Sequence, residues 1–300
     1  MDAYLLTGPT AVGKTAITQD LAGQHGWPIL STDSMQVYRG MNIGTAKPSV
    51  AERGEVSYLG IDLVDPDESF STGDYLRTVA QDCAEYTTAL ATGGTGLYLK
   101  ALVLGLDELP AAPVELRARL EALFERDGLS GITREAVKHY GSLEKVLDDP
   151  RNPRRVMRAL ELAEMGVDLP RRFEKTPRIR LPALHMDRDK LKERILCRVN
   201  QMFDQGLLDE VEELLNYFPE WSHTAAQAIG YKECRAILCG EISMEEGKER
   251  IAIRTRQYAK RQLTWLNNQF EVTWIEVGRG AVDSVQRYFE EHGPVRLAGI

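Results

Sequence analysis

Hydrophobic positions in the first hundred residues come in short runs, separated by stretches in which apolar residues recur every three or four positions. This pattern predicts short strands alternating with amphipathic helices, and therefore an α/β fold with a parallel sheet and helices on both of its faces. We expect strands at Ala3–Thr7, Ile29–Thr32 and Ala89–Thr92, and helices at Thr15–Gln24 and Leu97–Leu104.

The pattern changes after Gly105. The segment Leu109–Pro113 contains two prolines and predicts a turn or linker. Beyond it, apolar residues repeat at helical spacing, and no strand-like run occurs between Val114 and about Pro177. We therefore predict an all-helical insertion domain at residues 114–177, which interrupts a core formed by residues 1–113 and 178–300.

The second core segment returns to mixed patterns. Strands are expected at Leu181–Met186 and Glu271–Val277. The helices predicted between them are long: Asp189–Gln205, Leu207–Tyr217, Thr224–Cys239 and Met244–Asn267.

Composition places the chain among globular proteins. Of its 300 residues 43% are hydrophobic and 27% are charged, which excludes disordered and fibrous classes. No apolar run approaches the roughly 18 residues of a membrane span, and the first residues lack the basic segment of a signal peptide, so we expect a cytoplasmic protein without membrane association. The four cysteines fit no zinc or CxxC spacing and are expected to be free thiols. A net charge of −8 argues against a general nucleic-acid coat protein and allows a local basic groove.

A phosphate-binding motif follows the first predicted strand. Residues Gly8–Thr15 satisfy G-x-x-x-x-G-K-[ST] and open a predicted helix, which is the context that this motif requires. Backbone N–H groups and a helix N-terminus would face an anion, Lys14 would add a positive charge, and the Thr15 hydroxyl would ligate Mg²⁺. The motif predicts a di- or triphosphate ligand. Its candidate residues are Gly8, Thr10, Ala11, Val12, Gly13, Lys14 and Thr15.

ATP chemistry in such a fold needs a metal-binding carboxylate at the end of a second apolar strand. The segment Gly60–Pro66 is a poor match, and the strand Ala89–Thr92 runs into Gly93–Gly96 instead of an acid. The chain therefore has a phosphate-binding loop without a clear second motif for phosphoryl transfer.

Three further loops of small or polar residues come at or near strand ends. Asp33–Tyr38 follows a strand, Gly93–Gly96 follows another, and Gly44–Pro48 carries a lysine. The carboxyl ends of parallel strands line the ligand crevice of an open sheet, so Asp33 is expected near the phosphate loop. Each loop alone has a simpler interpretation, a helix cap at Asp33 or a plain turn at Gly93–Gly96. Their convergence would be more informative than any one of them.

Taken together, the motifs resemble those of the tRNA dimethylallyltransferases, also called tRNA isopentenyltransferases. The matching strings run in order from residue 8 to about 267: Gly8–Thr15, Asp33–Tyr38, Gly44–Pro48, Gly93–Tyr98, Arg154–Glu161, Gly230–Glu233 and Lys260–Leu266. The resemblance implies a P-loop-kinase-like core with a helical insertion. It also implies transfer of a dimethylallyl group from dimethylallyl diphosphate to the exocyclic amine of the adenosine immediately 3′ of the anticodon.

The same resemblance assigns residues. Asp33 is in the family position of the catalytic base, and Thr95 is where the family places a substrate contact near the reacting centre. Ser34, Met35 and Gln36 match the segment that touches tRNA beside the target base, and Arg117 matches a second tRNA contact. The partners implied are the anticodon stem-loop and dimethylallyl diphosphate, with Mg²⁺ as cofactor.

Basic residues gather in two places. The window Arg151–Arg180 holds nine basic and four acidic residues, and Lys260 and Arg261 belong to a second cluster with Arg250, Arg254 and Arg256. A solvated basic face is the simpler interpretation of either cluster; with the family match, we expect RNA contacts from Arg154, Arg155, Arg158, Lys260 and Arg261. Arg194 and Arg198 lie one helical turn apart and are predicted to point at the diphosphate, unless they pair with neighbouring acids. Tyr258 and Trp265 are expected to be core.

The chain departs from the family pattern at Val56–Gly60, at Asp149–Arg151 and at Gln227, all outside the phosphate loop and the Asp33 segment. An ATP-dependent small-molecule or nucleotide kinase is the alternative enzyme, disfavoured by the missing carboxylate. A non-catalytic P-loop RNA-binding module is a third hypothesis, but it gives Asp33 and Thr95 no task. We expect no obligate protein partner, and a monomer is adequate for the predicted site.

Overall fold

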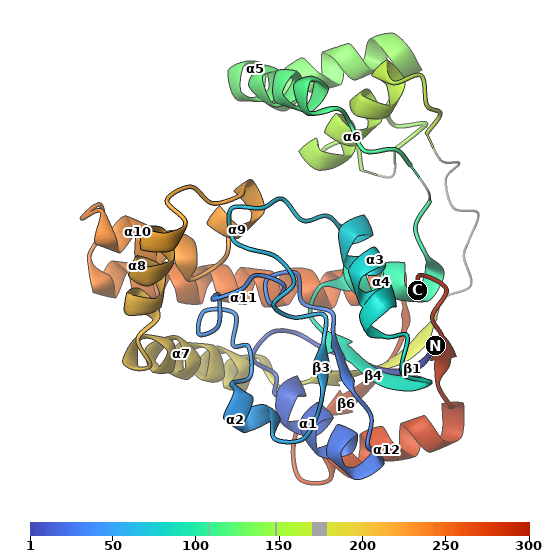
Figure 1. Cartoon of the computed structure of the whole chain (residues 1–300), viewed down its shortest axis with the longest axis vertical. Coiled ribbons are helices and arrows are strands. Elements are labelled where there is room, and N and C mark those ends of the chain that lie inside the picture. The colour runs from blue at the N-terminus through green and yellow to red at the C-terminus, as the bar shows by residue number, and fades with distance from the viewer. Residues whose placement is uncertain (108, 148, 170–178) are drawn as a thin grey trace. The chain divides into compact units, whose positions relative to one another are not determined.

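In the computed structural model, the residues described are 1–107, 109–147, 149–169 and 179–300. The chain divides into two compact units, Met1–Leu106 with Arg178–Ile300, and Asp107–Pro177 (Figure 1). The predicted insertion at 114–177 falls within the second unit. Its last residues, 170–177, lie outside the described residues, as does residue 178, the predicted start of the second core segment.

The first unit is built on a sheet, seven-stranded within the described residues, in the order β3-β2-β4-β1-β5-β6. The neighbours along this path are parallel, and β7 pairs antiparallel with β1. The strands are β1 Asp2–Thr7, β2 Ile29–Ser31, β3 Tyr58–Leu59, β4 Thr88–Gly93, β5 Arg180–His185, β6 Glu271–Glu276 and β7 Val295–Arg296. The predicted parallel sheet is therefore confirmed, with strand ends displaced by one residue.

Helices cover both faces of this sheet (Figure 1). Side chains alternate along each strand, so Leu5 joins one hydrophobic core and Leu6 the other. The face of Leu6 packs against α1 and α12, and the face of Leu5 against α3, α4 and α11. The helices of this unit are α1 Lys14–His25, α2 Val50–Arg53, α3 Thr72–Asp82, α4 Gly96–Leu104, α7 Arg188–Asp204, α8 Leu207–Tyr217, α9 His223–Ala226, α10 Tyr231–Leu238, α11 Met244–Gln269 and α12 Ala281–His292.

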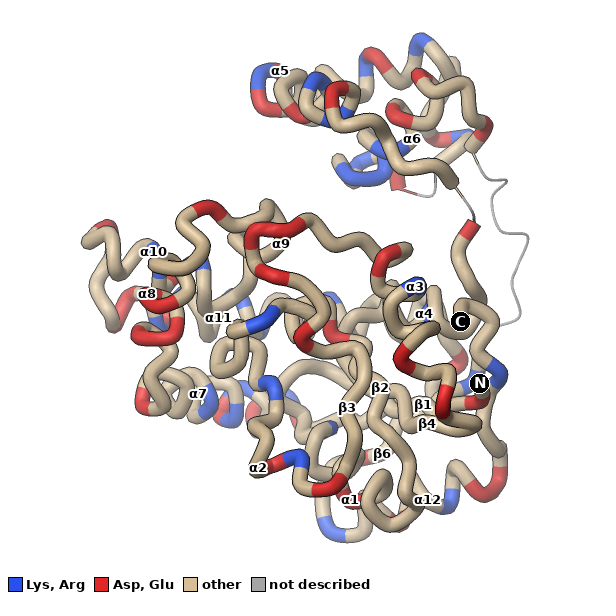
Figure 2. The backbone as a smooth tube through the Cα atoms, viewed as in Figure 1, with Lys and Arg blue, Asp and Glu red and all other residues tan. Residues whose placement is uncertain are grey.

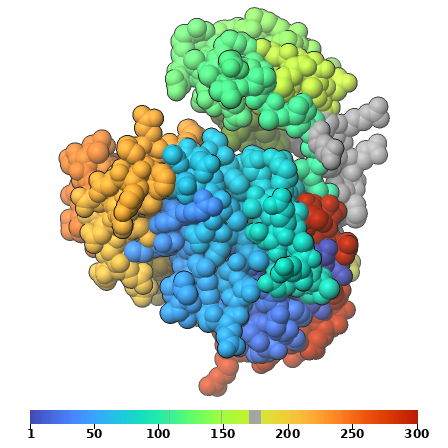
Figure 3. All heavy atoms as spheres, viewed as in Figure 1, coloured from blue at the N-terminus to red at the C-terminus, as the bar shows by residue number. Residues whose placement is uncertain are grey.

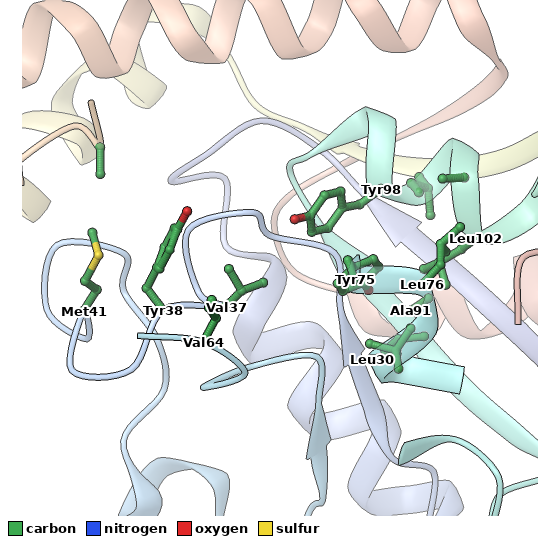
Figure 4. Packing of buried hydrophobic residues seen from close by; sticks show 14 of the residues in the cluster. Leu30, Val37, Tyr38, Met41, Val64, Tyr75, Leu76, Ala91, Tyr98 and Leu102 are labelled. Carbon is green, nitrogen blue, oxygen red and sulfur yellow. The ribbon is translucent and has the colours of Figure 1, made fainter. Parts of the chain in front are cut away.

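The core beneath α3 and α4 fixes the end of β2. Tyr75 and Tyr98 stack with ring centroids 4.0 Å apart, among Leu30, Leu76 and other buried side chains (Figure 4). The buried Tyr75 hydroxyl donates to the Ser31 carbonyl oxygen over 2.7 Å. Because Ser31 is the last residue of β2, this bond holds the strand end from which the Asp33 segment departs.

The second unit is helical in its described part, as the apolar spacing predicts. It contains α5 Val114–Tyr140, interrupted by non-helical backbone at Gly128, and α6 Pro153–Glu164, whose first turn is capped by the Asn152 side chain. The two helices share a hydrophobic core that includes Leu120, Ile132 and Leu160.

One predicted helix is wrong in extent. The segment Thr224–Cys239 is two helices, α9 and α10, separated around Gly230, whose φ of 97° is outside the helical region. The Glu233 carboxylate accepts from the Gly230 N–H over 2.9 Å, which starts α10 at that point. The sequence patterns also missed five elements: α2, β3, α3, α12 and β7.

None of the helices in the described residues is long and apolar enough to cross a membrane. The four cysteines are free thiols, as expected.

Candidate active site

A cavity of about 490 Å³ opens at the carboxyl ends of β1, β2 and β4. It is bounded by the phosphate loop (Gly8–Thr15), the Asp33 segment, the loop after it, the end of β4 and α7. Its lining residues are Thr10, Ala11, Gly13, Lys14, Thr15, Ala16, Thr18, Ile29, Ser31, Asp33, Gln36, Thr45, Ala46, Pro48, Tyr58, Thr92, Gly93, Arg194, Cys197, Arg198 and Gln201. The loops that the sequence singled out therefore meet at one crevice.

The phosphate loop depends on its glycines. Gly8 has φ 148°, and a Cβ there would lie 2.7 Å from the Leu184 carbonyl oxygen. Gly13 has φ 103° and directly precedes α1. These conformations turn the backbone around the N-terminus of α1, where N–H groups lack intrahelical partners and attract anions.

Lys14 is held inside this loop. Its Nζ donates to the carbonyl oxygens of Gly8 and Pro9, each over 2.9 Å. Burial lowers the pKa of Lys14 to about 8, an effect that the Asp33 carboxylate opposes and the Arg198 guanidinium reinforces. A phosphate group in the cavity would stabilise the ammonium form of this lysine.

Helix α7 supplies two arginines on the other side of the loop, in a stretch rich in basic positions (Figure 2). The Arg194 guanidinium lies close to Gly13, since a Cβ on that glycine would be 3.3 Å from its Nη2. Arg198 Nη1 donates to Thr10 Oγ1 over 3.4 Å. Burial lowers the pKa of Arg198, and Asp33 opposes that shift. The structure thus brings Lys14, Arg194 and Arg198 together around one cavity.

Asp33 faces these cations. Its Oδ1 accepts from the Met35 N–H over 2.9 Å, a local turn similar to the cap that was the simpler interpretation. Its charge partly offsets the lowering of the Lys14 and Arg198 pKa values by burial, so the carboxylate is within electrostatic reach of both. Asp33 lines the cavity.

Thr95 is joined to the Asp33 segment from β4. Its Oγ1 accepts from the Ser34 N–H over 3.0 Å and donates to Ser34 Oγ over 3.1 Å. Its backbone N–H donates to the Thr32 carbonyl oxygen over 3.0 Å. Thr95 is therefore hydrogen-bonded to Ser34, the chain neighbour of Asp33, at the ends of β2 and β4.

Gln36 makes hydrogen bonds within the protein, whereas Met35 packs against the core. Gln36 Oε1 accepts from Ser31 Oγ over 2.8 Å, and its Nε2 lies 3.4 Å from the carbonyl oxygens of Thr45 and Ala46. Met35 is partly buried against the hydrophobic core that contains Leu5. The Gln36 amide thus links two loops that line the cavity.

The loop Gly44–Pro48 reaches the cavity through Thr45, Ala46 and Pro48. Its lysine does not contribute a free cation there. Lys47 is 6% exposed, and its Nζ donates to Asp62 Oδ1 over 2.5 Å and to the Tyr38 carbonyl oxygen over 2.7 Å.

The motif Gly230–Glu233 belongs to the first unit, where it holds the loop after β2 in place. Tyr231 donates to Glu210 Oε1 over 2.6 Å, and the Glu210 carboxylate accepts from the Ile43 N–H. A Cβ on Gly44 would lie 2.4 Å from the Tyr231 ring. These contacts hold the loop after β2 against α8 and α10, where the two regions form adjoining surface (Figure 3).

Two residues of α11 belong to the site and were not predicted there. Gln262, 6% exposed, accepts from the Thr10 N–H over 2.8 Å and donates to the Gly94 carbonyl oxygen over 2.9 Å. The Tyr258 hydroxyl lies beside Gly94, since a Cβ on that glycine would be 4.0 Å from it. Burial raises the pKa of Tyr258 to about 12. Tyr258 was expected to be core, and its half-buried ring instead brings a hydroxyl to the residue before Thr95. Gln262 stands in the quoted motif Lys260–Leu266, which was the available signal.

In the second unit, two predicted RNA contacts are ion-paired. Arg117 Nη1 lies 3.1 Å from Glu161 Oε1, and Arg158 Nη1 lies 3.0 Å from Glu161 Oε2. Glu161 is 1% exposed. Arg158 also donates to the Pro110 carbonyl oxygen over 2.9 Å. Both guanidinium groups thus compensate a buried carboxylate within this unit.

The remaining basic candidates differ in their surroundings. Arg154 and Arg155 on α6 are exposed, as are Lys260 and Arg261 on α11. Arg254, from the same predicted cluster as Arg261, pairs with buried Glu233. The basic positions 171, 172, 175 and 178 of the Arg151–Arg180 window lie outside the described residues.

The metal donors available in the cavity are few. The described residues contain no cluster of three or more histidine, cysteine or carboxylate side chains that could hold a metal ion. The cavity does present the Thr15 hydroxyl beside the phosphate loop. Mg²⁺ is commonly held by one or two protein oxygens together with phosphate and water, so this donor set fits an ion that arrives with a diphosphate.

Comparisons with known proteins agree with this architecture. A family model described as IPP transferase matches residues 36–269, and one described as isopentenyl transferase matches residues 1–60. The chain is 38% identical over 291 residues to "tRNA dimethylallyltransferase 2" of Syntrophus aciditrophicus (strain SB), covering 91% of each chain.

The solved structures that are similar to this chain also include transferases that act on tRNA. The tRNA isopentenylpyrophosphate transferase of Bacillus halodurans has a TM-score of 0.65 and 34% identity, with 97% of this chain and 99% of that one covered. A eukaryotic dimethylallyltransferase acting on tRNA shares the fold, with a TM-score of 0.72 at 21% identity, over 96% of this chain and 78% of that one.

Proposed function

The chain belongs to the tRNA dimethylallyltransferase family and is a prenyl transferase that modifies tRNA; within that activity, we propose a specific reaction and specific residue roles. The donor is dimethylallyl diphosphate, and the acceptor is the exocyclic amine of the adenosine immediately 3′ of the anticodon. The observation that carries this proposal is that Asp33 shares one cavity with Lys14, Arg194 and Arg198.

The cationic side of the cavity suits a leaving group. As the bond between the allylic carbon and the bridging oxygen breaks, negative charge grows on the diphosphate. Lys14, the two arginines of α7 and the N–H groups of the phosphate loop line the side of the cavity where that charge would grow. They would stabilise it once the diphosphate replaces the hydrogen bonds that Lys14 and Arg198 make to the loop. The phosphate loop would then hold diphosphate and transfer no phosphoryl group.

The carboxylate supports the acceptor half of the reaction. The adenine amine is a poor nucleophile because its lone pair is delocalised into the ring. As its nitrogen bonds to the allylic carbon, it must lose a proton, and in this proposal Asp33 accepts it. General base catalysis of this kind contributes roughly 10²–10⁴-fold. The products are N-dimethylallyl adenosine, diphosphate and the proton taken by Asp33.

Thr95 and Ser34 would position the base beside Asp33. Their mutual hydrogen bonds hold the two hydroxyl groups together, and Ser34 directly follows Asp33 in the chain. The adenosine must leave its stack to enter the cavity, at a cost of a few kcal/mol that is smaller in a loop than in a duplex. Exposed Arg154, Arg155, Lys260 and Arg261 would bind the RNA backbone, since phosphate contacts position a nucleic acid.

Mg²⁺ is the proposed cofactor, held by the Thr15 hydroxyl and by diphosphate oxygens. It would supply charge neutralisation on the leaving group. The residues described above act on the donor and acceptor in addition to this ion.

The kinase alternative lacks support in the same region. Strand β4 lies beside β1 and ends at Gly93, in register with Thr7, where phosphoryl-transfer enzymes of this fold commonly place a carboxylate. The comparisons likewise match transferases that act on tRNA.

The function is tested with purified protein, labelled dimethylallyl diphosphate and an unmodified tRNA that has adenosine 3′ of its anticodon. We expect label in the RNA. A matched tRNA with guanosine at that position should remain unlabelled. Absence of label in the first tRNA would refute the proposed reaction, and equal labelling of both would refute the proposed acceptor.

A further inference from the structure

The Gln262 side chain connects two loops that serve opposite halves of the proposed reaction. Its Oε1 accepts from the Thr10 N–H in the phosphate loop, and its Nε2 donates to the carbonyl oxygen of Gly94, next to Thr95. An amide can accept at one atom and donate at the other, which neither a carboxylate nor an apolar side chain can do. Both bonds are largely shielded from water, because Gln262 is 6% exposed.

On the donor side, the Gln262 side chain bonds to Thr10 of the phosphate loop. A bound anion would change the other hydrogen bonds of this loop. Lys14 Nζ bonds to the carbonyl oxygens of Gly8 and Pro9, immediately before Thr10. Arg198 bonds to the Thr10 side chain. A diphosphate competes for both cations, so its binding alters the hydrogen bonds that hold Thr10 and hence the position of the Gln262 amide.

On the acceptor side, the bridge ends at the residue before Thr95. Thr95 in turn bonds to Ser34, the neighbour of Asp33. The Tyr258 hydroxyl, one turn of α11 before Gln262, lies beside Gly94, since a Cβ on that glycine would be 4.0 Å from it. A shift of the Gln262 amide is therefore transmitted to the group proposed to hold the adenine.

The fit around this amide is close. A Cβ on Gly94 would lie 2.1 Å from Gln262 Nε2, which is the flexible end of a side chain. The glycine is therefore needed for the bridge, and an alanine at this position would displace the amide while leaving the loop backbone in a conformation it can adopt.

We propose that Gln262 is a positioning residue that makes the binding of the donor diphosphate and of the RNA adenosine cooperative. This inference rests on the proposed function. Coupling between two sites is reciprocal, so each ligand should tighten the other by the same factor, typically about 5–150-fold.

The coupling is measured with inorganic diphosphate as the donor probe. Its Kd is determined by calorimetry with and without a saturating unmodified anticodon stem-loop RNA, for the unaltered protein, Gln262→Met and Gln257→Met. Gln257 is an exposed glutamine on the same helix and serves as the matched control. We expect a coupling factor above about 5 in the unaltered protein and in Gln257→Met, and a factor near one in Gln262→Met.

A second pair of variants separates this role from general stability. Gly94→Ala should reduce the coupling factor when Gln262 is present. In the Gln262→Ala variant, the same substitution should have no further effect, because the contact between residue 94 and the Gln262 amide is already lost. Additive effects, an unchanged factor in Gln262→Met or no coupling in the unaltered protein would overturn the inference. Label transfer to tRNA by the unaltered protein reports separately on the proposed reaction, so the two proposals fail in distinguishable ways.

Discussion

Arg198 of α7 reaches the phosphate loop, where its Nη1 donates to Thr10 Oγ1 over 3.4 Å. The two residues are far apart in the sequence, and this contact brings a helix of the second core segment to the anion site of the first. The cavity therefore exists only when both segments of the interrupted core are assembled, because neither segment alone supplies the three cations around it.

Removing the α7 charges should weaken diphosphate binding unequally. Arg198→Gln is expected to raise the Kd by roughly 10–100-fold, since hydrogen bonds to charged groups contribute about 1.5–3 kcal/mol. Arg194 is exposed, so Arg194→Gln should have a smaller effect that diminishes further as salt is added. Calorimetry at two ionic strengths measures both, with exposed Arg188→Gln on the same helix as control. Equal effects for all three variants would contradict the assignment.

Diphosphate affinity should depend on pH through Lys14. Burial lowers its pKa to about 8 from 10.5, so above pH 8 the lysine of the empty site is increasingly neutral. Binding must then take up a proton, and the affinity falls by up to tenfold per pH unit. The ionisation of diphosphate itself also changes the affinity with pH. Dividing the affinity of the unaltered protein by that of Lys14→Met at each pH removes this contribution. We expect this ratio to be level below pH 8 and to fall above it; a ratio independent of pH would contradict the assignment.

The same lowered pKa has a consequence for stability. Between pH 8 and 10.5 the unfolded chain binds more protons at Lys14 than the folded protein does, so this residue makes folding more favourable as the pH rises through that range. The destabilisation from the buried ammonium is fully present below pH 8. Thermal unfolding of the unaltered protein and Lys14→Met across this range should show the difference, and parallel curves would argue against a buried, charged lysine.

The buried carboxylate of the second unit gives a stability prediction. Glu161 is compensated by two arginines that are themselves partly exposed. Arg117→Ala or Arg158→Ala leaves one partner in place, whereas the double variant leaves a buried charge unpaired and should cost about 3–5 kcal/mol. Adding Glu161→Gln to the double variant removes that charge and should restore much of the loss. Chemical denaturation measures these values, and an additive series without rescue would contradict the pairing.

The fold was largely predictable from periodicity. The strands of the central sheet and the long helices α1, α7, α8 and α11 have enough residues to show their apolar spacing. Short elements do not, since α2 and β3 offer four and two residues. Length does not explain α3 and α12, which have 11 and 12 residues and were also missed. The break before α10 was missed because it depends on a Glu233 contact with the Gly230 backbone, which spacing does not reveal.

The part of the site that lies at the carboxyl ends of the strands was predictable, because the ends of parallel strands meet at one edge of the sheet. The positions of Lys14, Asp33, Arg194 and Arg198 around one cavity follow from sheet topology and helical spacing, and the structure brings them together. The Gln262 bridge and the Tyr258 hydroxyl could not be inferred, because they depend on how α11 crosses two loops distant in sequence. The pairing of Arg117 with Glu161 also depends on tertiary packing and could not be inferred from the sequence. The RNA contact expected of Arg117 came from the family resemblance and stays a prediction.

The central claim, that Asp33 is the base opposite the phosphate loop, is tested most directly by Asp33→Asn. This variant retains an oxygen that can accept from the Met35 N–H but cannot take a proton from the adenine amine. Single-turnover transfer from dimethylallyl diphosphate to tRNA should fall by roughly 10²–10⁴-fold while the Kd for diphosphate changes little. A Kd that rises as far as the rate falls would assign Asp33 to anion or metal binding instead, and an unchanged rate would show that it is not the base.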